Sequence, residues 1–306
     1  MEYQQYLTGL TKGDIRALAR CISLVENEAQ GYEQLLTHLP ASGTTRVIGV
    51  TGPPGAGKST LVNALIAALL HRQQKIAIIA IDPSSPFNFG ALLGDRIRMN
   101  QHFNDPNVYI RSLASRGALG GLSAKIIEVC DLVKGAGFDY LFIETVGVGQ
   151  SEVEIAGIAD TTIVTVVPEA GDEIQTMKAG LMEIADIFVV NKADRDNAND
   201  FVKNLRLLAH SRMNENWQIP VIKTIATRQE GIEEVIDHIQ QHQQLITHNR
   251  ERHTLLLAEK AYQLIQHRRM KNLSKYQLQQ QIAQYSELTS FNIYRFVQQF
   301  EEDAQV

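Results

Sequence analysis

A glycine-rich run that ends in a lysine and a serine carries the clearest chemistry in this 306-residue sequence. The run reads Gly52-Pro53-Pro54-Gly55-Ala56-Gly57-Lys58-Ser59, and Thr60 follows it. It matches G-x-x-x-x-G-K-S, the phosphate-binding P-loop. The glycines let the backbone aim its N–H groups at phosphate oxygens, and the N-terminus of a following helix adds positive potential. We expect Lys58 to reach the β- and γ-phosphates and the Ser59 hydroxyl to ligate Mg²⁺.

The sequence on either side of this run fits the same interpretation. Residues 47–50 read as a buried strand, and residues 60–66 read as a helix. Strand, glycine loop and helix form the structural context in which the motif binds phosphate. The alternative is a glycine turn that binds nothing, but it would not explain why every signature position is filled.

A second motif, Asn191-Lys192-Ala193-Asp194, selects the base. It follows the apolar run 187–190 and spells N-K-x-D, in which the aspartate accepts hydrogen bonds from N1–H and the exocyclic amine of guanine. Adenine offers neither donor, and a site built for such bonds rejects analogues that lack them by roughly 10⁴-fold or more. We expect the Lys192 stem to lie on the base, Asn191 to tie the motif to the P-loop, and the Ala226 N–H to reach the guanine oxygen. The predicted ligands are GTP and GDP.

Two strand ends supply acidic side chains. Asp82 ends the apolar run 76–81, and we expect it to hold Mg²⁺ directly or through water. The alternative is an aspartate that begins a turn before Pro83. Glu144 ends another apolar run and stands three residues before Gly147. We expect Glu144 to hold metal-bound waters or to position the attacking water, and the Gly147 N–H to sense the γ-phosphate.

The residue that follows Gly147 predicts a slow reaction. Ras-like GTPases have a water-orienting glutamine at that place, whereas this chain has a valine, with Gln150 two residues further along. The loop must therefore rearrange before hydrolysis becomes fast, and an arginine is one known remedy. By position alone, the candidate arginines are Arg98, Arg111 and Arg116.

Two further loops contain residues that can respond to the nucleotide. Residues 90–99 form the natural switch I region, where Asp95 can approach Mg²⁺; the alternative is a surface helix with an ordinary Asp–Arg ion pair. Residues 169–178 form another glycine-containing loop after a strand, and we expect it to face a partner.

The elements that must position these residues alternate between strand and helix. We expect strands at 46–50, 76–81, 107–111, 139–144, 161–167, 187–190 and 221–225. This alternation predicts an α/β fold, with a mostly parallel sheet, helices on both faces and ligands at the carboxyl ends of the strands. We expect three parts: an N-terminal helical extension at 1–42, a P-loop domain at 43–245 and a helical arm at 246–306. The arm is predicted either to form a homodimer or to pack on its own core.

Composition excludes some functions. The net charge of −5 argues against nucleic acid as a partner, and no apolar run approaches the ~20 residues of a membrane span. Cys21 and Cys130 lie in helical patterns and are expected to be buried free thiols in a reducing cytoplasm. His238 and His242 are spaced for a metal on one helix face, but with no third ligand nearby we expect them to be exposed to solvent.

Together these residues resemble the MeaB/ArgK family of P-loop GTPases, whose human member serves methylmalonyl-CoA mutase. The resemblance covers roughly residues 10–240. It rests on Gly52–Thr60, Asp82-Pro83-Ser84-Ser85, Leu93-Gly94-Asp95-Arg96, Arg116-Gly117, Glu144-Thr145-Val146-Gly147-Val148-Gly149-Gln150-Ser151-Glu152 and Gly171-Asp172-Glu173 with Gln175 and Lys178.

The resemblance implies a GTPase chaperone that binds a B12-dependent acyl-CoA mutase and gates the loading of adenosylcobalamin, which the mutase carries. The mutase would accelerate GTP hydrolysis. The resemblance also implies metal or catalytic roles for Asp95 and Glu144, places Gln150 in switch II, and places Lys178 in a loop that the partner repositions. The chain departs from the family in switch I, where Phe89-Gly90-Ala91 replaces Gly-Gly-Ser.

Other functions are less consistent with the residues. A metallochaperone for another metalloenzyme usually has a Cys/His cluster near the P-loop or a His-rich tail, and this chain has neither. A non-enzymatic module with a relict P-loop would not need Lys58, Ser59, Asp82 and Glu144. A kinase would need an acceptor site, and nothing in the sequence identifies one.

Overall fold

The computed structural model describes residues 2–40, 44–82, 102, 104–114, 125–145, 154–170, 179–210, 217–248, 250–270, 273–284 and 291–303. The chain divides into two compact units, Met1–Leu256 and Leu257–Val306. Each unit is described by itself.

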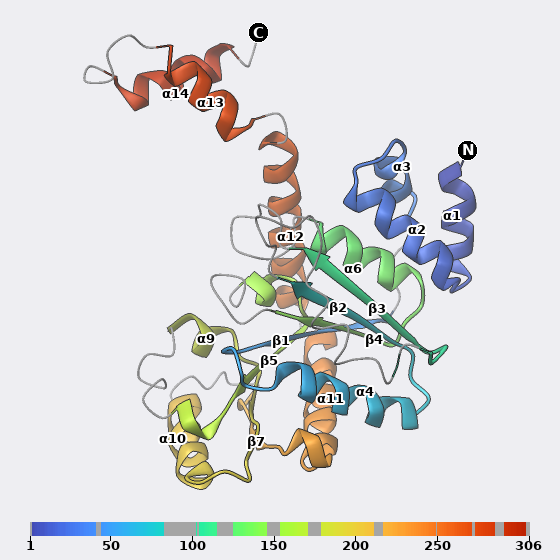
Figure 1. Ribbon diagram of the computed structural model, residues 1–306, viewed down its shortest axis with the longest axis vertical. Coiled ribbons are helices and arrows are strands. Elements are labelled where there is room, and N and C mark those ends of the chain that lie inside the picture. Colours follow the sequence, from blue (N-terminus) through green and yellow to red (C-terminus); the bar gives the residue numbers. More distant parts are fainter. Residues whose placement is uncertain are drawn as a thin grey trace. The chain divides into compact units, whose positions relative to one another are not determined.

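A seven-stranded parallel sheet forms the centre of the first unit (Figure 1). Its strands are β1 (Arg46–Thr51), β2 (Ile76–Asp82), β3 (Val108–Ala114), β4 (Tyr140–Glu144), β5 (Thr161–Val166), β6 (Ile187–Val190) and β7 (Val221–Lys223). They lie in the order β3-β2-β4-β1-β5-β6-β7, and every neighbouring pair is parallel. The predicted α/β class and all seven predicted strands are confirmed, with ends that differ by at most three residues.

Helices cover both faces of the sheet because alternate strand residues point to opposite sides. Val47, Ile79 and Leu113 pack with α6 (Ile126–Gly135) and with the N-terminal helices α1 (Glu2–Thr11), α2 (Ile15–Glu26) and α3 (Tyr32–Thr37). Ile48 and Ile78 face the other way and pack with α4 (Lys58–His71) and α11 (Ile232–His248). The short helix α9 (Ala179–Ile184) and α10 (Ala198–His210) complete the layers around β5 and β6.

The N-terminal helices cover part of one face of the sheet. The Asp14 carboxylate accepts a hydrogen bond from the Arg16 N–H at 2.8 Å and so caps α2, as its place before an apolar helical pattern indicates. Leu18 and Ile22 of this helix are fully buried in the core that contains Ile79 and Leu113. Burial of this kind contributes about 1.5–3 kcal/mol for each large apolar side chain.

Three aspartates, one before each of three strands, hold the amino edge of the sheet. Asp160 precedes β5 and accepts a hydrogen bond from the Val47 N–H of β1 at 2.9 Å. Asp186 precedes β6 and accepts one from the Thr162 N–H of β5 at 2.9 Å. Asp139 precedes β4 and accepts one from the Lys75 N–H, beside β2, at 2.7 Å. Each carboxylate thus binds the beginning of a neighbouring strand.

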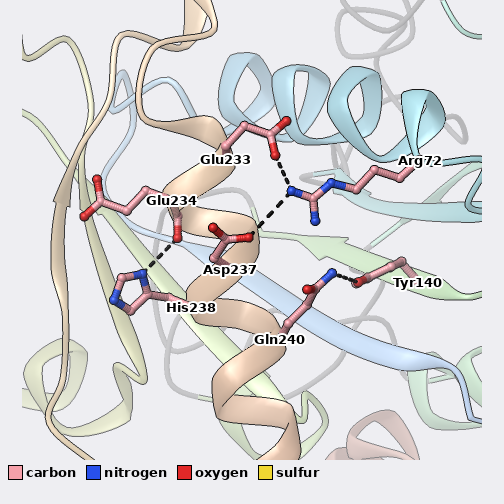
Figure 2. Close-up of polar contacts among 7 residues, drawn as sticks. All are labelled: Arg72, Tyr140, Glu233, Glu234, Asp237, His238 and Gln240. Atoms are coloured by element: carbon pink, nitrogen blue, oxygen red, sulfur yellow. Dashed lines mark hydrogen bonds and ion pairs between the residues drawn. The ribbon is translucent and has the colours of Figure 1, made fainter.

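A side-chain clasp joins α4 to α11. Figure 2 shows Arg72, which ends α4, reaching Glu233 and, at 3.6 Å, Asp237 on α11. Further along α11, the Gln240 amide donates to the Tyr140 hydroxyl of β4 at 3.3 Å. The Arg72 contacts thus join α4, which begins at the P-loop, to α11, which follows the segment expected to contact the base, and the Gln240 contact joins α11 to β4.

Two histidines on α11 were expected to be exposed to solvent, and one of them is buried. His238 is only partly exposed, but His242 has 1% of its surface exposed, so the expectation that both histidines face solvent is wrong for His242. Its ring nitrogens lie 2.8 Å from the Thr161 hydroxyl and 3.2 Å from the Asp186 carboxylate, and its ring packs on Trp217 at 4.9 Å.

The second unit contains the end of α12 (Arg250–Met270), together with α13 (Lys275–Ile282) and α14 (Ile293–Asp303). Ser274 caps α13 in a reciprocal capping box with Gln277. Many large apolar side chains of this unit are exposed, among them Leu257, Tyr262, Ile265, Tyr276 and Tyr294. No helix among the described residues combines the length and apolarity that crossing a bilayer requires.

Candidate functional site

The P-loop crosses from β1 to α4 in a conformation that requires glycine at two positions. Gly52 has φ +134°, and a Cβ there would lie 2.0 Å from the backbone oxygen of Thr165. Gly57 has φ +84°, and a Cβ there would lie 2.4 Å from the Asn191 amide nitrogen. The loop therefore passes closer to β5 and to the N-K-x-D motif than any residue with a side chain allows.

Lys58 is the first residue of α4 and is buried. Its ammonium group donates to the backbone oxygens of Gly52 at 2.8 Å and Pro53 at 3.1 Å. The side chain thus lies over the loop, with its charge against the carbonyls of the strand-to-helix turn. A phosphate bound in the loop would give this cation a charged partner, which forms stronger hydrogen bonds than a carbonyl does.

Ser59 and Glu144 meet at the carboxyl edge of the sheet. The Ser59 hydroxyl donates to Glu144 Oε1 at 2.6 Å, and both residues are buried. The register of β1 with β4 brings them together, because it places Glu144 beside Val50, shortly before the P-loop. The register of β2 with β4 places Ala80 beside Glu144, so Asp82 at the end of β2 lies at the same edge. A hydroxyl and a carboxylate are ligands that Mg²⁺ prefers, so this donor set fits the metal.

A second buried pair joins the same two segments, and the sequence analysis did not identify it. The hydroxyls of Thr51 and Thr145 lie 3.0 Å apart, and the two residues are 0% and 2% exposed. Thr51 directly precedes Gly52, and Thr145 directly follows Glu144. The sequence did contain a sign of this pair, because both threonines are polar residues at the ends of otherwise apolar strands and each lies next to a motif.

Asn191 joins the base-reading motif to the P-loop. Its amide nitrogen donates to the Ala56 oxygen at 3.1 Å, and its amide oxygen accepts from the Ala226 N–H and the Thr224 hydroxyl, both at 3.2 Å. This side chain is expected to tie the two motifs together, and it makes that contact. Lys192 adds a further link, since its ammonium group donates to the Gly55 oxygen at 2.8 Å while its backbone adopts φ +56°.

A pocket of about 240 Å³ lies between these segments. Gly57 and Thr60 line one side, Lys192 and Asp194 another, and residues 225–227 a third. Its walls are the residues expected to contact the phosphates and the base. Ala226 lines this pocket, but its N–H is donated to Asn191, so its bond to a guanine oxygen stays a prediction.

Two arginines beside the pocket were not predicted as site residues from the sequence. Arg228 lies 3.8 Å from the Asp194 carboxylate. Arg195, which lines the pocket, pairs with Glu169 at the end of the β5 segment. Long-range pairing of this kind leaves no local pattern, although Arg195 stands directly after N-K-x-D.

Several expected site residues lie outside the described residues: Asp95, Gly147, Gln150 and Lys178. The same is true of Arg98 and Arg116, two of the three arginine candidates. The third, Arg111, lies inside β3 and pairs with Glu26 of α2.

The residues present fit a guanine nucleotide with Mg²⁺. The two constrained glycines form a backbone cradle that a Cβ would fill, and α4 begins directly behind it. Pro53, Pro54, Gly55 and Ala56 complete the loop. The Asp194 carboxylate, on the pocket wall, has the acceptor chemistry that guanine requires. Ser59 and Glu144, with Asp82 on the adjoining strand, would hold the metal.

Comparisons with known proteins agree with this geometry. The family described as "Methylmalonyl Co-A mutase-associated GTPase MeaB" matches residues 18–282. A protein of Pyrococcus abyssi, provisionally named a GTPase, is 48% identical over 242 residues, which cover 78% of this chain and 75% of that protein. The mouse protein named "Methylmalonic aciduria type A homolog, mitochondrial" is 38% identical over 263 residues, covering 78% of this chain and 63% of that protein.

A solved structure extends the agreement to nearly the whole chain. The crystal structure titled "LAO/AO transport system kinase" superposes with a TM-score of 0.72 at 26% identity, covering 99% of this chain and 98% of that one. The family match spans the P-loop, the Ser59–Glu144 pair and the base-reading motif alike. The chain therefore belongs to the methylmalonyl-CoA mutase-associated GTPase family MeaB, and it is a GTP hydrolase.

Proposed function

We propose that this GTPase is a chaperone for a B12-dependent acyl-CoA mutase and gates the loading and protection of the adenosylcobalamin that the mutase carries. The observation that carries the proposal is the family match over residues 18–282, whose description names association with methylmalonyl-CoA mutase. The name of the mouse relative, a methylmalonic aciduria type A homolog, supports the same client.

The chain's own residues divide into binding and hydrolytic roles. Lys58 leaves the Gly52 and Pro53 carbonyls to hold the β- and γ-phosphates, while the loop N–H groups from Gly55 to Thr60 surround them. Asp194 and Lys192 hold the base, and Asn191 keeps the two sets of residues in register. When bound, Mg²⁺ neutralises charge that develops on the phosphate oxygens.

Hydrolysis depends on the carboxyl ends of β2 and β4. Ser59 and Glu144, which now share a hydrogen bond, would hold the metal or its waters, and Glu144 would orient the attacking water. We assign Asp82 and Asp95 to the metal, Gly147 to sensing of the γ-phosphate, and Gln150 and Lys178 to loops that the partner rearranges. Because a valine stands where Ras-like GTPases have glutamine, intrinsic turnover is slow and the partner accelerates it.

The exposed apolar side chains of the second unit support a further proposal, a homodimer formed through α12–α14. Tyr262, Ile265 and Tyr294 are between 53% and 84% exposed, and a contiguous apolar surface of such side chains is typical of an interaction site. Light scattering of the full chain tests this proposal, and Ile265→Glu should shift a dimer towards monomer. The proposal places the protein in the cytoplasm, where its buried free thiols Cys21 and Cys130 stay reduced.

Measuring GTP hydrolysis by the full chain, alone and with an adenosylcobalamin-dependent acyl-CoA mutase of the same organism, tests the client. We expect slow basal turnover that rises by about ten-fold or more, a modest fraction of what partner proteins achieve for other GTPases. Lys58→Ala should abolish both rates, whereas Lys203→Ala, an exposed residue on α10, should change neither. Unstimulated turnover with every such mutase would contradict the proposal and favour a metallochaperone for another metalloenzyme.

A further inference from the structure

Two glutamates, one at the end of α2 and one in the turn after it, contact basic residues that precede and follow residues 115–124 in the sequence. Glu26, the last residue of α2, pairs with Arg111 of β3. Glu28, two residues later, pairs with Lys125 at 2.9 Å, and Lys125 immediately precedes α6. The strand that leads into residues 115–124 and the helix that follows them are thus both held by one short stretch of the N-terminal helices.

The second of these contacts is buried at its lysine end, whereas the Glu28 side chain is 30% exposed. The Lys125 side chain is 9% exposed, and its ammonium group also lies 3.3 Å from Glu128 and 5.1 Å from the centre of the Tyr32 ring. Burial alone lowers the pKa of Lys125, but the hydrogen bond with Glu28 and the charges of Glu128 and Glu28 outweigh it, so the net pKa is raised. The lysine therefore stays charged, and a buried charge depends on its partners.

The backbone at Glu28 adopts a conformation that glycine or asparagine occupies more readily. Its φ is +46°, in the left-handed region, where a side chain with a Cβ is strained. A glutamate is nevertheless the residue found at this turn between α2 and α3. In this conformation its carboxylate lies 2.9 Å from the Lys125 ammonium group.

The first of these contacts lies on β3, the edge strand that pairs with β2, whose last residue is Asp82. In the parallel register of β2 with β3, Arg111 lies opposite Ile79, and Ala114 lies opposite Asp82. The last residue of β3 thus lies beside Asp82. In turn, β2 pairs with β4 so that Ala80 lies opposite Glu144. A shift of β3 would therefore move its neighbour β2, which carries Asp82 and pairs with the strand that carries Glu144. Both carboxylates are assigned to the metal.

The apolar contacts beneath these ion pairs do not fix the position of α2 along the surface of the sheet. Leu18, Ile22 and Val25 of α2 pack against β2, β3 and α6 in one core. Such burial is strong but non-directional, and it tolerates small sliding of a helix over a sheet. Ion pairs with fixed partners remove that freedom, because Glu26 and Glu28 can meet Arg111 and Lys125 together in only one placement.

We propose that Glu26 and Glu28 are positioning residues for GTP hydrolysis. By holding Arg111 and Lys125, they fix β3, whose last residue lies beside Asp82, and the start of α6. They set turnover without setting nucleotide affinity, since the P-loop helix α4 packs in the core on the opposite face of the sheet. The proposal rests on the GTP hydrolase activity alone and is tested without the mutase.

The test uses the full chain carrying Glu26→Gln, Glu28→Gln, or both, which remove charge while keeping size. We expect kcat to fall by on the order of ten-fold in each single variant, because small misplacements at a reacting centre are costly. The KM for GTP and the Kd for GDP should change by less than about two-fold. Asp131→Asn is the matched control: it removes an exposed carboxylate on α6, 3.7 Å from Lys134, and should leave kcat unchanged.

A charge swap separates positioning from general loss of structure. Glu26 and Arg111 are 26% and 28% exposed, so the exchange Glu26→Arg with Arg111→Glu can restore the pair where each single change breaks it. We expect the double variant to recover most of kcat. The proposal is overturned if kcat is unchanged in Glu26→Gln, if KM rises in proportion as kcat falls, or if the swap restores thermal stability without restoring kcat. If Glu28→Gln does not fold, Glu26→Gln and the swap decide the question.

Discussion

Replacing Gly52 with alanine gives a sharp test of the P-loop geometry. The new methyl carbon would lie 2.0 Å from the Thr165 backbone oxygen, and contacts below 3.0 Å essentially never occur at real Cβ atoms. At least 1 Å of movement is therefore needed between the loop and β5. Neither side can yield by turning a side chain, because the oxygen belongs to the backbone of a central strand paired with β1 and β6.

Two effects set the magnitude. A φ of +134° is accessible almost only to glycine, and a residue with a Cβ held there costs about 1–3 kcal/mol. Forcing extra volume into a packed core costs about 1–3 kcal/mol more. We therefore expect Gly52→Ala to lower the free energy of unfolding by about 2–6 kcal/mol. Affinity for GDP should also fall, because the cradle must open.

Gly137→Ala is the matched control. Gly137 also has a positive φ, +76°, but a Cβ there meets nothing within 4 Å. In Gly137→Ala the free energy of unfolding should fall only by the cost of placing alanine in the left-handed conformation, about 1–2 kcal/mol. The variant should bind GDP normally. Urea denaturation and GDP titration measure both quantities. Equal losses of stability in the two variants would refute the close approach of Gly52 to β5.

Three other changes test separate parts of the molecule. Lys58→Ala should weaken GTP binding by about 100-fold, since it removes a charge-assisted contact, and tight binding by the variant would exclude the P-loop assignment. Asn191→Ala removes the side-chain bonds to Ala56 and Ala226 and should lower the free energy of unfolding by about 2–4 kcal/mol in urea; an unchanged midpoint would show that the link is not formed. Burial raises the pKa of the Cys21 thiol to about 11. Between the usual value near 9 and this value, the unfolded chain has lost a proton that the folded chain keeps, so stability falls as pH rises, and Cys21→Ala should flatten that fall.

The parallel sheet was predictable because its strands are buried on both faces. Runs such as Ile76–Asp82 and Ile187–Val190 are almost continuously apolar. The first ends in Asp82 and the second is followed by Asn191, both at the edge where ligands bind. The phosphate and base motifs could be recognised for the same reason. Their function requires particular residues at fixed spacing, and the structure brings Ser59 to Glu144 and Asn191 to Ala56.

The remaining features depend on pairings between distant parts of the chain. The contacts of Glu26 with Arg111 and of Glu28 with Lys125 join residues far apart in sequence, and no local pattern encodes them. The burial of His242 did leave a signal. It continues the apolar stripe of Val235 and Ile239 at helical spacing, so its place on the helix indicated the core even though its residue type suggested the surface.

The aspartates that precede β4, β5 and β6 fix the register of neighbouring strands in the sheet. The smallest slip that returns side chains to the same face moves a strand by two residues, about 6.6 Å, and carries each carboxylate out of reach of its N–H. Asp139, Asp160 and Asp186 therefore make strand sliding expensive at the edge opposite the nucleotide. The partner proposed for this GTPase would therefore act on a sheet whose strand registers are held by these three carboxylates.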